Sequence, residues 1–218
     1  MSNIQAVVFD VGETLINESR IWLRWAEHLG VPPLTFLGLI GAGVAQDTPF
    51  PETIRLIMPD FDFAEAKEAW AIAEPDSMRS TFNIDDLYPD VVPALQQLKD
   101  LGYKVIISGN QPPPATPALE LMNLPADVIW NSEEIGHEKP APEFFDAVTE
   151  LAGCPPEQIA YIGDRLDNDV IPAQRAGMFP ILLKRGPFGY LHAARPAAQG
   201  VPTIESLLEI PAILAQSE

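Results

Sequence analysis

Five short apolar runs have the length and the Val and Ile content of buried strands. They are "IQAVVFD" (4–10), "YKVIISG" (103–109), "ADVIWN" (126–131), "QIAYIGD" (158–164) and "FPILLKR" (179–185). Helical patterns between the runs include "DVVPALQQLKDLG", which closes at Gly102, and "APEFFDAVTELAG", which closes at Gly153. Strands and helices in alternation predict an α/β core with a parallel sheet and helices on both faces.

The stretch 16–87 departs from this alternation. Its period is helical, as in "RIWLRWAEHLG" and "FAEAKEAWAIA", and it has no strand-like run. We therefore predict a core made of residues 1–15 and 88–218 with a small all-helical insertion at 16–87. Trp22, Trp25 and Trp70 are expected in the core of that helical bundle. At the C-terminus, "TIESLLEIPAIL" predicts a final amphipathic helix after the loop "RGPFGYLHAARPAAQG".

Composition narrows the class of protein. With 47% hydrophobic residues, the chain can bury a substantial core. Thirty-one acidic against thirteen basic residues give a net charge of -18, which disfavours nucleic acids and anionic membrane surfaces as partners. A single cysteine, Cys154, excludes an internal disulfide and a thiolate metal site. Without a leader-like start or a long apolar run, we expect a cytoplasmic protein with a small-molecule substrate. No pattern predicts its oligomeric state.

Candidate chemistry lies at the ends of the predicted strands. Asp10 ends the first run, Ser108, Gly109 and Asn110 follow the second, and Asp164 and Asp169 follow the fourth. Lys139 stands in "GHEKPAP", before a helix predicted to start near Pro140 or Pro142. Because ligands of open parallel sheets bind at the carboxyl ends of the strands, we expect these residues to form one site.

Four motifs in order resemble those of the haloacid dehalogenase-like (HAD) superfamily. "FDVGETL" is similar to its nucleophile motif, "VIISGNQ" to its serine or threonine motif, "GHEKPAPEFF" to its lysine motif and "YIGDRLDND" to its terminal acidic motif. The resemblance covers nearly the full chain, and 16–87 falls where the family places a helical cap. It implies a Rossmannoid core with a cap domain, in which Asp10 is the nucleophile, Thr14 orients the nucleophile loop and Lys139 neutralises phosphate.

The acidic residues predict a magnesium site. Asp10, Asp164 and Asp169, gathered in a cleft, would raise one another's pKa values unless a cation lay among them. Oxygen ligands suit Mg²⁺, whereas no His or Cys cluster is present for zinc. The resemblance adds the carbonyl of Gly12 as a ligand. Asp10 would then attack phosphorus and form an aspartyl-phosphate that water hydrolyses, which predicts a phosphatase for a small phosphorylated metabolite.

The serine motif has two registers. We prefer Ser108 as the phosphate-binding hydroxyl. If Asn110 instead matches the asparagine that often follows the family serine, Gly109 takes the serine position and Ser108 points to the other side of the strand. Phosphate would then be bound by backbone N–H groups. Gly109 and Asn110 are predicted to bind substrate in addition to Gly12 and Glu13.

Gly12 stands where phosphatases of the family usually have a second, acid–base aspartate. Glycine cannot transfer a proton, and such help is worth roughly two to four orders of magnitude in rate. The sequence therefore predicts a weakened phosphatase, a substrate with a good leaving group, or another acid, for which Glu13 is the nearest candidate. Glu18, Arg20, Arg24 and His28 are more typical of a solvated helix face. Two alternatives are a 2-haloacid dehalogenase, and a metal- and phosphate-binding regulatory protein without turnover.

Overall fold

The computed structural model describes residues 4–73, 82–112 and 114–216. Contacts divide the chain into two compact units, one made of Met1–Asn17 with Phe82–Glu218 and the other of Glu18–Thr81. Residues 82–87, which the sequence assigned to the insertion, thus belong to the first unit. Each unit is described by itself below.

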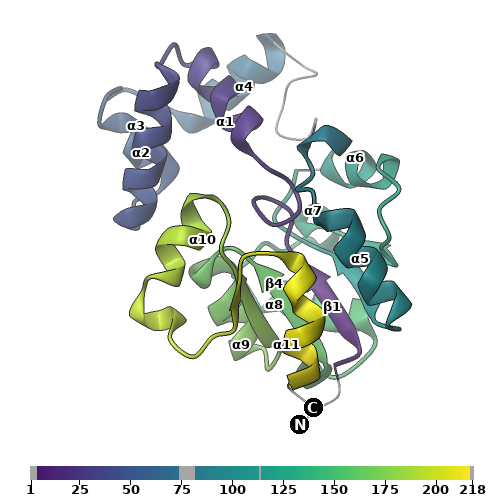
Figure 1. Cartoon of the computed structure of the whole chain (residues 1–218). Helices are drawn as coiled ribbons and strands as arrows, with labels where there is room; N and C mark the ends of the chain where they lie inside the picture. Colours follow the sequence, from purple (N-terminus) through teal and green to yellow (C-terminus); the bar gives the residue numbers. More distant parts are fainter. Residues whose placement is uncertain (1–3, 74–81, 113, 217–218) are drawn as a thin grey trace. The chain divides into compact units, whose positions relative to one another are not determined.

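The first unit is built on six parallel strands in the order β3-β2-β1-β4-β5-β6 (Figure 1). Their bounds are β1 Ala6–Phe9, β2 Lys104–Ile107, β3 Val128–Ile129, β4 Ile159–Gly163, β5 Phe179–Leu183 and β6 Thr203–Ile204. The five predicted strands and the parallel α/β fold are confirmed. The two-residue β6 was missed because it is too short to show a period.

Strand β1 lies in the middle of the sheet and sets the edge on which the site forms. All four of its residues are fully buried, as expected of a parallel strand covered on both faces. Phe9 pairs with Ile107 of β2 and with Ile162 of β4. This register brings Asp10, the residue after β1, beside the carboxyl ends of β2 and β4.

Helices cover both faces of the sheet. Helices α5 (Val91–Asp100) and α11 (Ile210–Gln216) lie on one face, and α8 (Pro142–Ala152) and α9 (Ile171–Arg175) lie on the other (Figure 1). Shorter helical segments connect them: α6 Ala115–Leu121, α7 Ser132–Ile135, α10 Gly186–Ala193, η2 Ile84–Asp86, η3 Pro156–Gln158, the π-helical turn η4 Leu166–Val170, η5 Pro196–Ala198 and η6 Leu207–Glu209. Helix α8 ends at the left-handed Gly153, as predicted.

Two C-terminal predictions are wrong. The segment 203–214 is not one helix, because β6 occupies its start and the Ser206–Glu209 capping box begins the short turn η6 ahead of α11. Likewise, the loop predicted at 185–200 contains helix α10. Its Gly186 and Pro187 stand at the beginning of that helix, where proline is favoured because the first N–H groups have no partner within the helix.

The segments that leave and re-enter the first unit pair with each other. Ile16 forms an antiparallel bridge with Leu87. The N–H of Tyr88 donates to the carbonyl of Leu15 at 3.0 Å, and the N–H of Asn17 donates to Asp86 at 2.8 Å. The two ends of the chain that flank unit 18–81 are therefore held together within the sheet-containing unit.

The second unit is all-helical. It contains α1 Ser19–His28, α2 Pro33–Ala45, α3 Phe50–Arg55 and α4 Phe63–Ala73. Trp25 and Trp70 are buried with their rings 4.5 Å apart, whereas Trp22 is half-buried, so the aromatic residues form the core of this bundle as predicted. Glu18, expected on a solvated face, is instead only 6% exposed.

In the described part of the chain, no single helix is long and apolar enough to cross a membrane, but α1 and α2 taken together meet that criterion, with a bend of 115° between them.

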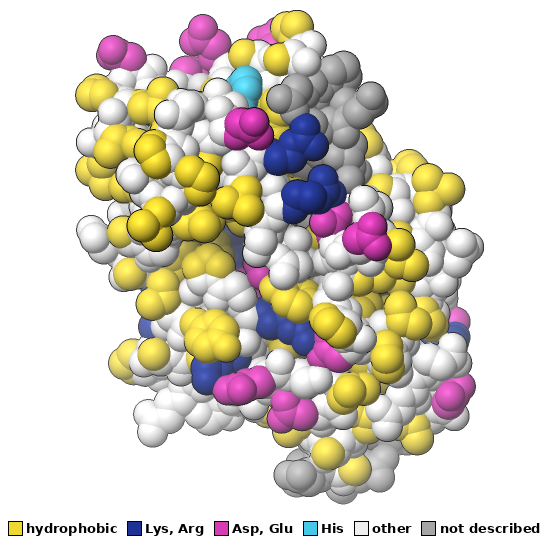
Figure 2. Space-filling view, turned by 45° about the horizontal axis from the view of Figure 1, so that its top comes forward, with side chains coloured by type: hydrophobic (Ala, Val, Ile, Leu, Met, Phe, Trp, Pro, Cys, Tyr) yellow, Lys and Arg dark blue, Asp and Glu magenta, His cyan; other side chains and the backbone are white. Residues whose placement is uncertain are grey.

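Figure 2 shows one face of the molecule. Acidic side chains are scattered over it singly and in small groups, among hydrophobic and uncharged ones. The negative charge does not gather into one acidic patch on this face.

Candidate active site

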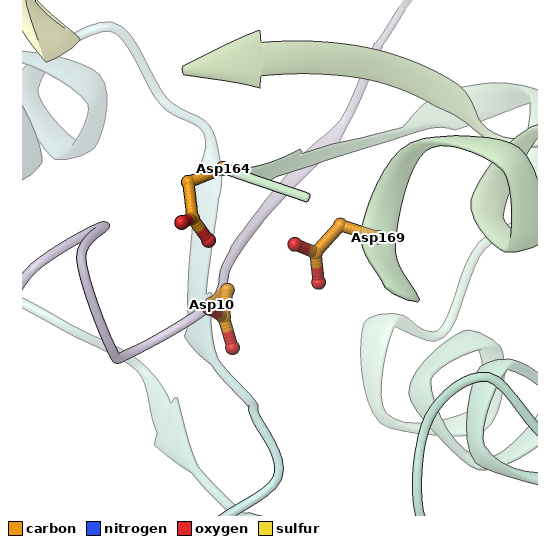
Figure 3. A group of neighbouring side chains, drawn as sticks. All are labelled: Asp10, Asp164 and Asp169. Atoms are coloured by element: carbon orange, nitrogen blue, oxygen red, sulfur yellow. The ribbon is translucent and has the colours of Figure 1, made fainter. Parts of the chain in front are cut away.

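Three carboxylates meet at the carboxyl ends of β1 and β4, where the strand order reverses. Asp10 follows β1, Asp164 follows β4, and Asp169 comes from the π-helical turn η4. An oxygen of each lies within 4.8 Å of the others, and the residues are 8%, 2% and 1% exposed. Figure 3 shows the three side chains around a common space. The structure thus brings together the acidic residues that the sequence singled out.

Gly163 allows Asp169 to approach. A Cβ atom at Gly163 would lie 2.3 Å from the Asp169 Cγ atom, so only glycine fits at the end of β4. The Arg165 N–H donates to Asp169 Oδ2 at 3.0 Å, which fixes the carboxylate at the start of the turn. Asp167, in the same turn, accepts two hydrogen bonds from the Arg165 side chain, at 3.1 and 2.6 Å.

Lys139 connects two of the carboxylates. Its Nζ atom donates to Asp10 Oδ1 and to Asp169 Oδ1, each at 2.6 Å. Helix α8 begins three residues later at Pro142, as predicted. The Asn110 side chain holds the backbone of Lys139, accepting from its N–H at 2.7 Å and donating to its carbonyl at 2.8 Å. Asn110 therefore positions the lysine.

Burial and neighbouring charges shift the pKa values of Asp164, Asp169 and Lys139. Burial raises the pKa of Asp164 well above its usual range, and Asp169 and Asp10 add to this effect. Burial also raises the pKa of Asp169, to about 6, although Lys139 pulls it down. Burial lowers the pKa of Lys139, but Asp10 and Asp169 outweigh burial, so that the pKa lies well above its ordinary value. Three carboxylates thus face one ammonium group.

This imbalance suits a hard divalent cation. The site offers carboxylate oxygens, the ligands that Mg²⁺ prefers, and a single Lys139 charge leaves the group net negative. Among the described residues, no histidine or cysteine joins this cluster. The donor set therefore fits Mg²⁺ and does not fit zinc.

The preferred register of the serine motif is wrong. The Ser108 hydroxyl donates to the Trp130 carbonyl at 2.7 Å and is fully buried there. Gly109 is the residue that faces the site, since a Cβ atom at this position would lie 2.5 Å from Asp10 Oδ1. Strand alternation explains the result, because successive residues point to opposite sides. No side-chain hydroxyl is therefore available at the motif position that faces Asp10.

The loop after Asp10 is a tight turn. The N–H groups of Leu15 and Ile16 both donate to the Val11 carbonyl at 2.9 Å, and the Glu13 N–H donates to Ile16 at 2.7 Å. Glu13 has a φ of 50°, a left-handed conformation that is uncommon for residues other than glycine. The Thr14 hydroxyl is buried and has no hydrogen-bond partner among the described residues, so Thr14 is held through its backbone.

Three residues that hold the chain around the site were not assigned to the site from the sequence. Asn131 accepts a hydrogen bond from the Gly109 N–H at 3.0 Å, and its place in an Asn-x-x-Glu capping box before α7 was the available sign. Tyr88 donates to Glu13 Oε2 at 2.5 Å, and burial and the neighbouring Glu13 carboxylate raise its pKa above the usual range. Arg185, which the sequence placed in a loop, is only 8% exposed and donates to the Thr14 carbonyl at 2.8 Å.

Comparison with known proteins identifies the family. Residues 4–177 match the family described as haloacid dehalogenase-like hydrolases. The chain therefore belongs to this hydrolase family, as the four motifs predicted.

Curated relatives that the chain resembles are phosphatases. Glyceraldehyde 3-phosphate phosphatase of Methanopyrus kandleri is 40% identical over 108 residues, 46% of this chain and 45% of that protein. Phosphoglycolate phosphatase 1 of Pseudomonas aeruginosa is 32% identical over 124 residues, 56% of this chain and 44% of that protein. The chain thus spans about half the length of these relatives.

Solved structures share the fold. A predicted phosphoglycolate phosphatase from Haemophilus somnus has a TM-score of 0.74 at 22% identity, with 98% of this chain and 99% of that chain covered. A 2-haloacid dehalogenase from Pseudomonas syringae has a TM-score of 0.62 at 22% identity, with 99% and 100% covered. At this identity the likeness concerns the fold alone, and it spans phosphatases as well as dehalogenases.

Proposed function

We propose that the protein hydrolyses a small phosphorylated metabolite, with Asp10 as the nucleophile and Mg²⁺ as the cofactor. The observation that carries the proposal is the Asp10–Lys139–Asp169 contact beside Asp164, at the carboxyl ends of the central strands. Asp10, Asp164 and Asp169 would hold the cation with the Gly12 carbonyl. When bound, Mg²⁺ neutralises the carboxylates and polarises the phosphoryl oxygens. The phosphatase names of the relatives support this substrate class.

In this proposal, the nucleophile, the charge compensation and the phosphate contacts come from different residues. Asp10 attacks phosphorus, the P–O bond to the leaving group breaks, and the leaving group departs with that electron pair. Water then attacks the phosphorus of the aspartyl-phosphate, which releases inorganic phosphate and regenerates the Asp10 carboxylate. Lys139 compensates the charge of the phosphoryl oxygens. Among the described residues, the hydrogen bonds that close the turn come from the N–H groups of residues 13–16, which leaves those of Val11 and Gly12 for a phosphate oxygen. Gly109 and Asn110 contribute less directly, because the Gly109 N–H and the Asn110 side chain already bind Asn131 and Lys139.

The two glycines restrict the substrate within this proposal. Gly12 cannot protonate a leaving group, and Gly109 offers no hydroxyl to the phosphate. We therefore expect best turnover on phosphate esters or anhydrides whose leaving group departs as an anion without protonation. We assign unit 18–81 as the cap domain that the family resemblance implies.

The first test is steady-state hydrolysis of p-nitrophenyl phosphate with MgCl₂ and with EDTA. We expect Mg²⁺-dependent turnover that Asp10→Asn reduces by at least about a thousandfold, because the nucleophile is lost. Asp146→Asn on the exposed side of α8 is the matched control and keeps full activity, since it makes the same charge change away from the site. Full activity in Asp10→Asn would refute the proposal.

The pair of glycines also favours a second candidate, a protein that binds a phosphorylated ligand without turning it over. Phosphate binding by wild type, measured by calorimetry in MgCl₂ without product formation on any phosphate ester, would select this candidate. Halide release from a 2-haloacid that survives EDTA would instead select a dehalogenase.

A further inference from the structure

The loop that carries Asp10 into the site contains a residue in an unfavourable conformation. Glu13 adopts a φ of 50°, which a side chain with a Cβ atom resists, and it is only 7% exposed. Such a conformation persists when surrounding contacts over-determine it, and it is typical of functional sites. The contacts that hold Glu13 in place therefore bear on how the nucleophile is presented.

The Glu13 side chain is fixed at its tip and along its stem. Its Oε2 atom accepts a hydrogen bond from the Tyr88 hydroxyl at 2.5 Å. Its stem lies against Gly186 at the start of α10, where an added Cβ atom would lie 2.7 Å from Glu13 Cγ. The residue is thus held from two elements far away in sequence, the chain entering α5 and the chain leaving β5.

Arg185 fixes the next residue of the loop. Its Nη1 atom donates to the Thr14 carbonyl at 2.8 Å, and its guanidinium lies over the Tyr88 ring, 4.2 Å from the ring centre. Its Nη2 atom forms an ion pair with Asp90. The same Asp90 oxygen accepts from the Ser206 hydroxyl at 2.7 Å and from the Leu207 N–H at 2.9 Å. The arginine is therefore itself firmly oriented.

We propose that Tyr88 and Arg185, acting through Glu13 and Thr14, form a clamp that positions Asp10 and the Gly12 carbonyl for the reaction. The proposal rests on the proposed phosphatase function and names Tyr88 and Arg185 as positioning residues. Small displacements of a reacting group cost large factors in rate, so a loop with a strained residue next to the nucleophile needs such support. The clamp also accounts for a glutamate at a position whose backbone favours glycine.

The test combines kinetics with hydrogen exchange. In Tyr88→Phe, which keeps the ring under Arg185, we expect kcat on p-nitrophenyl phosphate to fall about tenfold with KM within about twofold. The amides of Glu13, Leu15 and Ile16, which close the turn, should exchange at least about tenfold faster, while the amides of β4 keep their rates. Tyr190→Phe, with Tyr190 59% exposed, is the matched control and changes neither quantity.

A second pair of variants separates the clamp from a general loss of stability. Arg185→Lys keeps the positive charge but loses the pair of Nη atoms that bind the Thr14 carbonyl and Asp90 at the same time, and we expect the same direction of change as in Tyr88→Phe. In a Glu13→Gly background, where the left-handed conformation costs little, Tyr88→Phe should have no further effect on loop exchange. Equal effects of Tyr88→Phe in both backgrounds would overturn the proposal.

The outcomes keep the two proposals distinct. Unchanged loop exchange in Tyr88→Phe, or faster exchange with unchanged kcat in an active enzyme, contradicts the clamp. An equal rise in exchange at β4 also contradicts it, because the residue would then serve stability alone. If wild type hydrolyses no phosphate ester, the phosphatase proposal and the positioning role fail, whereas the exchange result still decides whether Tyr88 and Arg185 hold the loop.

Discussion

Glycine occupies two positions that frame the Asp10 carboxylate. Gly12 follows Asp10 by two residues, and Gly109 faces Asp10 from the end of β2. In the proposed phosphatase, the first leaves the site without the proton donor, and the second without the hydroxyl, that the family resemblance implies. Each loss can be reversed by one substitution, which makes the site suited to single-residue tests.

Gly12→Asp should restore proton transfer to the leaving group. On an alkyl phosphate we expect kcat/KM to rise by at least about tenfold, within the two to four orders that acid–base help supplies. On p-nitrophenyl phosphate, whose leaving group needs no proton, the change should stay within about threefold. Gly12→Asn, of equal size but unable to transfer a proton, is the control. An equal gain in Gly12→Asn would contradict this explanation.

Gly109→Ala and Gly109→Ser distinguish the steric effect of a Cβ atom beside Asp10 from the contribution of a hydroxyl to phosphate binding. A Cβ atom at this position would press on Asp10 Oδ1, which Lys139 holds, so we expect alanine to lower kcat/KM for p-nitrophenyl phosphate at least about tenfold. Serine adds the same Cβ atom together with a hydroxyl for the phosphate, and should be several-fold more active than alanine. Equal activity of the two variants would show that a hydroxyl there contributes nothing.

At the scale of the element, α10 depends on one close approach. A Cβ atom at Gly189 would lie 2.5 Å from the Leu183 carbonyl oxygen of β5, and backbone cannot move aside easily. We expect Gly189→Ala to lower the free energy of unfolding by about 1–3 kcal/mol, as overpacking does. In α2, Gly38 has open space around its Cβ direction, so Gly38→Ala should be neutral or stabilising by up to about 1 kcal/mol. Urea unfolding of both variants tests the contrast, and a stable Gly189→Ala would refute it.

Elements with a strong period could be predicted from the sequence, and short or tertiary-determined ones could not. The helical period of "FAEAKEAWAIA" coincides with helix α4, and the structure brings together Asp10, Lys139, Asp164 and Asp169, which the four motifs singled out. Strand β6 was not predicted because a strand of two residues shows no alternation of apolar and polar positions. Helix α10 was predicted as a loop because it begins with Gly and Pro, which are also typical of loops. The prediction that Ser108 faces the site was wrong because successive strand residues point to opposite sides, so an error of one residue near the end of β2 reverses the assignment.

At the scale of the whole molecule, the buried carboxylates couple stability to pH and metal. The folded pKa values of Asp164 and Asp169 lie above the value of about 4 in an unfolded chain, and that of Asp169 is about 6. The native state then binds more protons than the unfolded state between these values. In EDTA, the stability that protonation of Asp169 supplies is present below about pH 4 and is lost as the pH rises through about 6, and Asp164 acts in the same direction.

We therefore expect the gain in Tm from MgCl₂ to be larger at about pH 7.5 than at about pH 5, because the cation replaces the missing protons. Thermal unfolding in EDTA and in MgCl₂ at both values measures it. Asp164→Asn should abolish most of the difference, whereas Asp146→Asn, with the same change in net charge at an exposed site, should retain it. A Mg²⁺ effect of equal size at both pH values would contradict the coupling.

The bridge between Ile16 and Leu87 has a consequence for how such a chain diversifies. The bridge joins the two chain segments that flank unit 18–81, and it lies within the sheet-containing unit. The entropic cost of closing the loop between these segments grows only with the logarithm of the loop length. A segment inserted after Asn17 therefore begins and ends at two stretches of chain that are already paired. The turn at residues 11–16, which follows Asp10, keeps its own hydrogen bonds. A different sequence between Asn17 and Phe82 can therefore replace unit 18–81 while the bridge between Ile16 and Leu87 stays in place.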